Sequence, residues 1–344
     1  MKDFDMKEWL LDLWEKAKVL PWKRIGLISL CVFLALLLIG LVAATILIEG
    51  MLGRIDRFET DPTAPSTQPY VPDDTIPSIS VTVPTAPSDI IAHKDIVNIM
   101  LVGQDRRNGG GRSNSDVMIL CTFNKKDKTI TLTSFMRDLY VSIPGNGMNK
   151  LNAAYPMGGY ELLGDTLLEN FGVQVDNYVE VDFAGFKKAV NILGGIDMYL
   201  TAEEAKYMNE APWDGLNSDG WALHEGVNHL NGDMALAYSR IRAIGYDYER
   251  TERQRKVLTA LIGKCKSMNL TTALNLVNQL LECVRTDMTD SEITSYVMTL
   301  FPLLAGEVTQ QRIPIEGSYE DNHNVIIPDF DLNHQFLWDT LIPD

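Results

Sequence analysis

The chain has 344 residues, of which 46% are hydrophobic and 22% are charged. These proportions are those of a globular protein with a sizeable core, and they exclude a largely disordered chain. The formal net charge of −16 argues against nucleic-acid binding, because contacts with phosphate backbones need a basic face.

The N-terminal region predicts a membrane anchor. Residues 25–48 contain no charged side chain, and as a helix they would span about 36 Å, against roughly 30 Å of bilayer hydrocarbon. A cleaved signal peptide is the alternative, but the run is too long for one and no small-residue cleavage site follows it. Residues 1–24 carry six Lys or Arg, so we expect this tail in the cytoplasm and the rest of the chain outside the cell membrane, as a single-pass protein.

The next segment, residues 49–93, is rich in Pro, Thr and Ser and predicts an extended extracellular spacer. A single domain is expected from 94 to 344. Its three cysteines, Cys121, Cys265 and Cys283, have no metal-binding spacing. We expect buried free thiols, with a bridge between Cys265 and Cys283 as the alternative.

The domain reads as α/β with a mixed central sheet. Apolar runs near 96–104, 117–123 and 129–135 are bounded by turn residues, as buried strands are. A strand at 175–183, an amphipathic helix at 183–195 and a strand at 196–200 form a unit typical of parallel or mixed sheets. Further helices are predicted at 159–170, 230–242, 249–268, 270–284 and 290–305, with an edge strand at 308–315.

Charged residues gather at the predicted strand ends. Asp105 follows the first strand and Asp116 begins the second. Two carboxylates about 4 Å apart repel by a few kcal/mol, and a divalent cation such as Mg²⁺ would relieve this. A pair of solvated turn aspartates is the alternative.

Arginines occur in the same segments. Arginine suits phosphate because it offers a planar fork of donors with a permanent charge. Arg250, Arg253 and Gln254 share one face of a predicted helix, and Arg240 and Arg242 lie where another helix ends. The arginines of these segments are Arg106, Arg107, Arg137, Arg240, Arg242, Arg250 and Arg253. They suggest a pyrophosphate-sized anion, with salt bridges to acidic neighbours as the alternative for some of them.

The histidines offer no familiar nucleophile or metal motif, which favours transfer at phosphorus through charge neutralisation and positioning. Seven ordered segments between about 95 and 266 then resemble the signatures of the LytR–CpsA–Psr family. They are NIMLVGQDRR, SNSDVMIL, SFMRDLYVSIPG, KLNAAYPMGG, VDFAGFKKAVNILGGIDM, HLNGDMALAYSRIR and RTERQRKVL. The chain has Met136 where that family usually has proline in the S-I-P-R-D motif.

The resemblance implies a three-layer α/β/α enzyme of a mainly Gram-positive cell envelope. It would move a glycopolymer (teichoic acid, capsule or another wall polysaccharide) from polyprenyl pyrophosphate onto peptidoglycan through a phosphodiester. An apolar tunnel between sheet and helices would hold the lipid. Two rival functions are a non-catalytic lipid-pyrophosphate-binding or regulatory module and a polyprenyl-pyrophosphate pyrophosphatase.

Motif position assigns roles within this resemblance. Asp105 and Asp116 would hold Mg²⁺, with Mn²⁺ as the alternative ion, and Asp247 would be a general base. Arg137 and Arg240 would act in catalysis. The pyrophosphate would be bound by Arg106, Arg137, Lys150, Arg240, Arg242, Arg250, Arg253 and Gln254.

Overall fold

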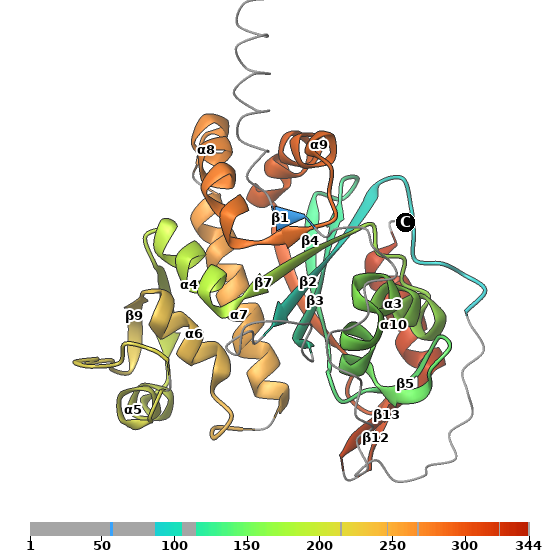
Figure 1. Ribbon diagram of the computed structural model, residues 1–344, viewed down its shortest axis with the longest axis horizontal. Coiled ribbons are helices and arrows are strands. Elements are labelled where there is room, and N and C mark those ends of the chain that lie inside the picture. The colour runs from blue at the N-terminus through green and yellow to red at the C-terminus, as the bar shows by residue number, and fades with distance from the viewer. Residues whose placement is uncertain are drawn as a thin grey trace, which may run out of the picture. The chain divides into compact units, whose positions relative to one another are not determined.

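The computed structural model describes residues 56–57, 87–104, 115–213, 215–245, 247–266, 268–322 and 324–342, all within the compact unit Ile55–Asp344 (Figure 1). Within these ranges, no helix combines the length and apolar character that a membrane crossing requires. The predicted tail (1–24), the predicted span (25–48) and most of the predicted spacer (49–93) lie outside the described residues.

A mixed seven-stranded sheet forms the centre of the described domain. The strands lie in the order β1 (Asp56–Arg57), β10 (Arg285–Thr286), β7 (Asn177–Asp182), β2 (Ile96–Gln104), β3 (Ser115–Asn124), β4 (Thr129–Phe135) and β11 (Glu307–Ile313). β3 runs antiparallel to its two neighbours, β2 and β4, whereas β7 runs parallel to β2 and β11 runs parallel to β4. The carboxyl ends of β2, β4 and β7 therefore lie at the same sheet edge as the start of β3.

One face of the sheet is sealed by α3 (Ala154–Phe171) and α10 (Phe330–Leu341) (Figure 1). Met100 and Leu120 point into this layer and are 0% exposed. They pack in one cluster with Leu163 of α3 and Leu337 of α10. α3 ends at Gly172, whose φ of +67° is left-handed, a conformation that glycine adopts without steric cost.

The other face carries α4 (Phe183–Ile192), α7 (Asp247–Cys265), α8 (Leu270–Leu280) and α9 (Asp290–Leu300) (Figure 1). α4 begins directly after β7, because the Asp182 carboxylate accepts a hydrogen bond of 2.7 Å from the Gly185 N–H and caps the helix. A second core cluster joins α4 and α7 to α5 (Ala202–Glu210), α6 (Gly232–Arg240), β8 (Ile196–Leu200) and β9 (Gly226–Leu230). The fold is therefore α/β with helices on both faces of a mixed sheet, as predicted.

Most predicted elements are present, including the edge strand, which is β11. The predicted strand at 196–200 is present as β8, but it lies outside the central sheet and pairs antiparallel with β9 in a separate hairpin. Met198 and Leu200 of β8 face the second core, while Tyr199 between them is 62% exposed. This one-sided burial suits a hairpin rather than the middle of a sheet covered on both faces.

The pairing of the smaller hairpins was not predicted. β5 (Tyr140–Ile143) pairs with β6 (Gly147–Lys150), and β12 (Tyr319–Asn322) pairs with β13 (Val325–Pro328). Short 3-10 helices occur at Leu151–Ala153, Leu281–Cys283 and Phe301–Ala305. Cys121, Cys265 and Cys283 are free thiols; Cys121 and Cys283 are buried as predicted, whereas Cys265 is only half-buried.

Candidate anion-binding site

Asp116 lies on a β-bulge at the start of β3. Gln104 pairs with Ser115 while Gly103 pairs with Val117, which leaves Asp116 as the extra residue. A bulge re-aims the side chain of the strand that carries it. The Asp116 Oδ1 atom lies 2.7 Å from Nη1 of Arg137 at the end of β4. Asp105 and Arg106, which the sequence placed beside this position, lie outside the described residues.

Arg137 is the centre of the charged site. Its Nε lies 3.3 Å from Oδ2 of Asp138 and 3.7 Å from Oδ2 of Asp247. Burial lowers the pKa of Arg137, but the three carboxylates outweigh it, so the net shift is upward and the guanidinium stays charged. Met136 fixes the backbone here, because its N–H donates a 3.0 Å hydrogen bond to the carbonyl of Ile313 and its side chain is fully buried. A proline, which lacks the N–H, could not make that bond.

Three further cations surround these carboxylates. Lys150 Nζ lies 3.3 Å from Oδ1 of Asp138, and Arg242 Nη2 lies 3.7 Å from Oδ1 of Asp116. Arg250 Nη2 lies 2.7 Å from Oδ1 of Asp247. We call this set the Arg137 cluster: Asp116, Arg137, Asp138, Lys150, Arg242, Asp247 and Arg250. Its cations outnumber its carboxylates, so an anion can be bound without expelling every internal partner.

Arg250 is the most buried cation of the cluster, with 3% of its surface exposed. Burial lowers its pKa, the nearby Asp247 opposes that shift, and the positive charge of Arg137 adds to it. Its Nε atom is buried and has no hydrogen-bond partner among the described residues. An incoming anion would therefore gain a donor that is already desolvated.

Two other predicted ligands lie near the cluster. The guanidinium carbon of Arg240 lies 5.0 Å from the ring centroid of Phe183, the residue that follows β7 at the same sheet edge. Gln254 is half-buried and lies one turn after Arg250 on α7.

Arg253 points elsewhere. Its Nε donates to Oε1 of Glu204 at 2.9 Å, and its Nη1 and Nη2 donate to the carbonyls of Ile241 and Ile244 at 3.2 and 2.8 Å. These bonds hold the segment that contains Arg242, which makes Arg253 a positioning residue in this geometry. Sequence reasoning missed Glu204, because its only local signal is the capping box that it forms with Thr201 at the start of α5.

A set of half-buried apolar residues adjoins the cluster. Leu101, Val117, Val179 and Val181 share one sheet face through the pairing of β2 with β3 and β7, and each is partly exposed. Val117 directly follows Asp116. We call these four residues the apolar floor. On the opposite face of the same strands, Met100, Val102 and Met118 are 0 to 2% exposed. The centre of the sheet is thus sealed on one side and incompletely covered on the side of α4 and α7.

Within the ranges that the structure describes, no group of three or more His, Cys, Asp or Glu could hold a metal ion. Asp116 supplies one carboxylate that is about one-third exposed. Mg²⁺ needs only one or two protein carboxylates when phosphate oxygens and water complete its shell, so Asp116 fits such a role.

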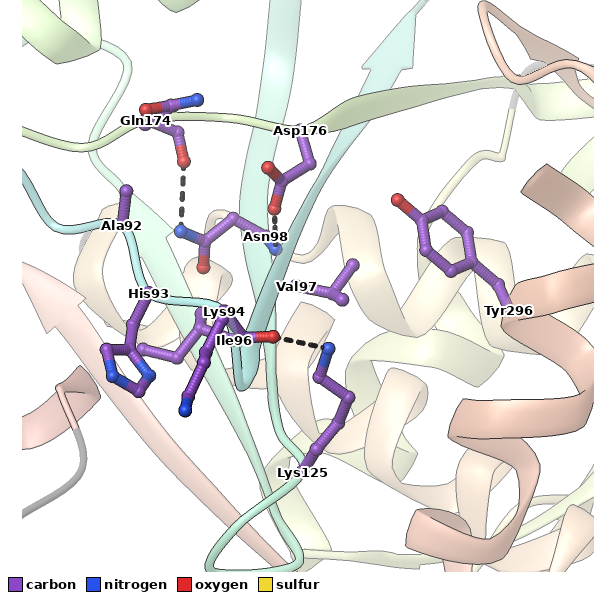
Figure 2. Close-up of a pocket in the computed structure, with 10 residues that line it drawn as sticks. All are labelled: Ala92, His93, Lys94, Ile96, Val97, Asn98, Lys125, Gln174, Asp176 and Tyr296. Carbon is purple, nitrogen blue, oxygen red and sulfur yellow. Dashed lines mark hydrogen bonds between the residues drawn. The ribbon is translucent and has the colours of Figure 1, made fainter.

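A pocket of about 560 Å³ lies at the opposite end of β2 (Figure 2). Several of its polar groups are already paired. The Asn98 N–H donates to Oδ2 of Asp176 at 2.7 Å, and Lys125 Nζ donates to the carbonyl of Lys94 at 2.7 Å. β2 is about 26 Å long at about 3.3 Å per residue, which separates this pocket from the Arg137 cluster. It is not part of the candidate site.

In this α/β domain, guanidinium groups gather at one end of the sheet strands, beside apolar residues that are only partly covered. These features are those of a protein that binds a phosphorylated ligand with an apolar part. Residues 67–338 match the LytR_cpsA_psr family. The chain belongs to this family, as its sequence motifs indicated.

Its relatives include transferases of teichoic acid. The chain is 31% identical over 235 residues to the polyisoprenyl-teichoic acid–peptidoglycan teichoic acid transferase TagU of Enterococcus faecalis, covering 67% of this chain and 73% of the relative. It is 32% identical over 249 residues to the transferase TagT of Bacillus subtilis, covering 71% and 74%. A solved structure of the family protein YwtF (TagT) with bound octaprenyl pyrophosphate lipid superposes with a TM-score of 0.54 at 26% identity, covering 72% of this chain and 91% of that one.

Proposed function

We propose that this protein transfers a glycopolymer from a polyprenyl-pyrophosphate carrier onto peptidoglycan through a phosphodiester. We further propose that it acts with Mg²⁺, as a single-pass membrane protein whose catalytic domain lies outside the cell. One observation carries the proposal: the cation-rich Arg137 cluster adjoins the partly exposed apolar floor. A ligand with a diphosphate head and an isoprenoid tail complements both parts. The similarity to teichoic acid transferases supports the same class of substrate.

Binding would use charge already present at the sheet edge. Arg137, Arg242, Arg250 and Lys150 each hold a carboxylate in the described structure, and the diphosphate oxygens would replace some of these partners. Replacing one charged partner by another avoids stripping water from the arginines during binding. Arg106, Arg240 and Gln254 would add donors at the rim, and Arg253 would hold the segment of Arg242.

The chemistry follows from the positions of Arg137 and Asp247. An acceptor hydroxyl on peptidoglycan attacks the phosphorus that bears the glycan, and its proton passes to the Asp247 carboxylate. The new P–O bond forms as the bond from that phosphorus to the bridging oxygen breaks, so the lipid leaves as a monophosphate. Arg137 stabilises the negative charge that develops on the phosphoryl oxygens. Asp116, together with Asp105, would hold Mg²⁺, which would supply further charge neutralisation at the diphosphate.

The proposal is tested by a transfer assay with the full chain in detergent, a polyprenyl-pyrophosphate-linked glycan, peptidoglycan fragments and Mg²⁺. Asp116→Asn keeps the size of the side chain and removes its charge, and we expect it to lower transfer at least a hundredfold. Asp331→Asn is the matched control, because Asp331 is an exposed carboxylate in the first turn of α10 on the other face of the sheet.

Two results would favour other functions. A binding or regulatory module needs the arginines and not Asp116, so undiminished function in Asp116→Asn would favour it. A pyrophosphatase would release glycan phosphate at the same rate with and without the peptidoglycan acceptor.

A further inference from the structure

Arg255 is a buried cation without a buried partner. Its surface is 7% exposed, and its Nε and Nη1 atoms have no hydrogen-bond partner among the described residues. Burial lowers its pKa to about 10, Glu252 on the same helix opposes that shift, and the positive charge of Arg312 adds to it. A charged group in this state is costly to keep, which points to an anion that completes its environment.

The position of Arg255 follows from its neighbours on α7. Tyr248, Arg255 and Thr259 are spaced i, i+7 and i+11, so they lie on one side of the helix. Tyr248 contacts Arg312 of β11, whose guanidinium carbon lies 4.1 Å from the ring centroid. Thr259 Oγ1 accepts a 2.8 Å hydrogen bond from Gln310, also on β11. Arg255 therefore faces β11 and its neighbour β4 between these two contacts.

Two more polar groups lie on this part of the sheet. Ser134 of β4 is the direct pairing partner of Arg312, so both side chains project from the same sheet face. Ser134 Oγ is buried and has no hydrogen-bond partner among the described residues. Arg312 is 20% exposed and is paired, at 2.8 Å from its Nη2, with Glu316, whose side chain is 87% exposed. An ion pair this exposed is weak and can exchange for a stronger anion.

We propose that Arg255, Arg312 and Ser134 form a phosphate-class oxyanion site between α7 and the β4–β11 edge, separate from the Arg137 cluster. Two guanidinium groups and a hydroxyl match the several acceptor oxygens of a tetrahedral phosphate. The anion would neutralise the repulsion between the two arginines, and it would enter past Arg312 by displacing Glu316.

The site would accept phosphate as a free ion or as a phosphodiester group of a polyanion. The experiment uses the full chain in detergent at constant ionic strength, with sodium phosphate as the probe in titration calorimetry. A second titration uses bis(glycerol) phosphate, a soluble phosphodiester. Tighter binding of the diester would identify a polymer as the source, and binding of inorganic phosphate alone would identify the free ion.

Four variants separate this site from the Arg137 cluster. We expect Arg255→Met and Arg312→Gln each to weaken phosphate binding at the new site about tenfold or more, because each removes charge-assisted hydrogen bonds. Arg137→Gln should leave that binding in place. Lys256→Met, the next residue on α7 and half-exposed, is the matched control for loss of one positive charge and should change nothing.

Thermal unfolding in phosphate-free buffer adds a readout that a structural role would not give. Arg255→Met should unfold at the same or a higher temperature than the natural chain, because it removes a buried charge that lacks a partner. It should also lose the phosphate-dependent rise in melting temperature. The proposal is overturned if no phosphate binding survives Arg137→Gln, or if Arg255→Met and Arg312→Gln both bind phosphate as the natural chain does.

Discussion

Replacing Arg253, which contacts Glu204, distinguishes a positioning role of this arginine from direct binding of the ligand. Arg253 is 5% exposed, and the Glu204 side chain is 10% exposed, so both charges depend on each other. Arg253→Met removes the guanidinium donor from Oε1 of Glu204 and from the carbonyls of Ile241 and Ile244. Removing one partner of a buried pair costs about 3–5 kcal/mol, which for a domain of this size lowers the melting temperature by roughly 6–20 °C.

The assay pairs urea unfolding with lipid-pyrophosphate binding below the melting temperature. A double-mutant cycle with Glu204→Gln should recover part of the loss, because the remaining side chain is then uncharged while its capping oxygen is kept. Binding should fall only modestly, through looser positioning of Arg242. If Arg253→Met leaves the free energy of unfolding unchanged and abolishes binding, the positioning role is refuted and Arg253 is a ligand.

Three further predictions test other parts of the structure. Arg137→Lys keeps the charge but loses the planar fork, and we expect kcat for transfer to fall about 10²–10³-fold with little change in melting temperature, measured by steady-state kinetics and calorimetry. Burial raises the pKa of Cys121 to about 12, so at pH 8.5 only about 0.03% of this thiol is ionised. Iodoacetamide should therefore modify Cys121 in urea but not in the native protein, which peptide mass spectrometry would measure. Gly164→Ala should lower the free energy of unfolding by about 1–3 kcal/mol, because the new methyl group meets the Tyr178 hydroxyl. Gly263→Ala on α7 meets no other atom and should raise the free energy of unfolding by about 0.5–1 kcal/mol. Equal effects of the two replacements in urea unfolding would contradict both placements.

The sequence predicted the strands well where an apolar run was bounded by turn residues. β2, β3 and β4 follow one another and pair with their chain neighbours, so local pattern and sheet order agree. β8 shows the limit of this reasoning. The segment IDMYL has the composition of a strand, but whether it joins the main sheet depends on which strand it pairs with. Its partner, β9, begins 26 residues after β8 ends and follows an irregular loop. Pairing at that distance has no local signal.

The charged site was predicted as a set of residue types but not as a geometry. Asp116, Arg137, Lys150, Arg242, Asp247 and Arg250 do meet. Arg253 was assigned by motif position and grouped with Arg250 by helical spacing. A step of three residues turns the side chain by about 60°, enough to point it at α5 instead. Arg255 carried no signal in the sequence, because only the tertiary structure reveals that it is buried and lacks a partner.

The central claim, transfer through the Arg137 cluster, is tested most directly by mass spectrometry of the peptidoglycan acceptor. The full chain would be incubated with Mg²⁺, polyprenyl-pyrophosphate-linked glycan and peptidoglycan fragments in ¹⁸O-labelled water. Transfer predicts acceptor joined to glycan by a phosphodiester that contains no ¹⁸O, together with lipid monophosphate and no product from Arg137→Ala. Unmodified acceptor, with ¹⁸O in the released phosphates, would mean that water is the acceptor and would contradict the claim.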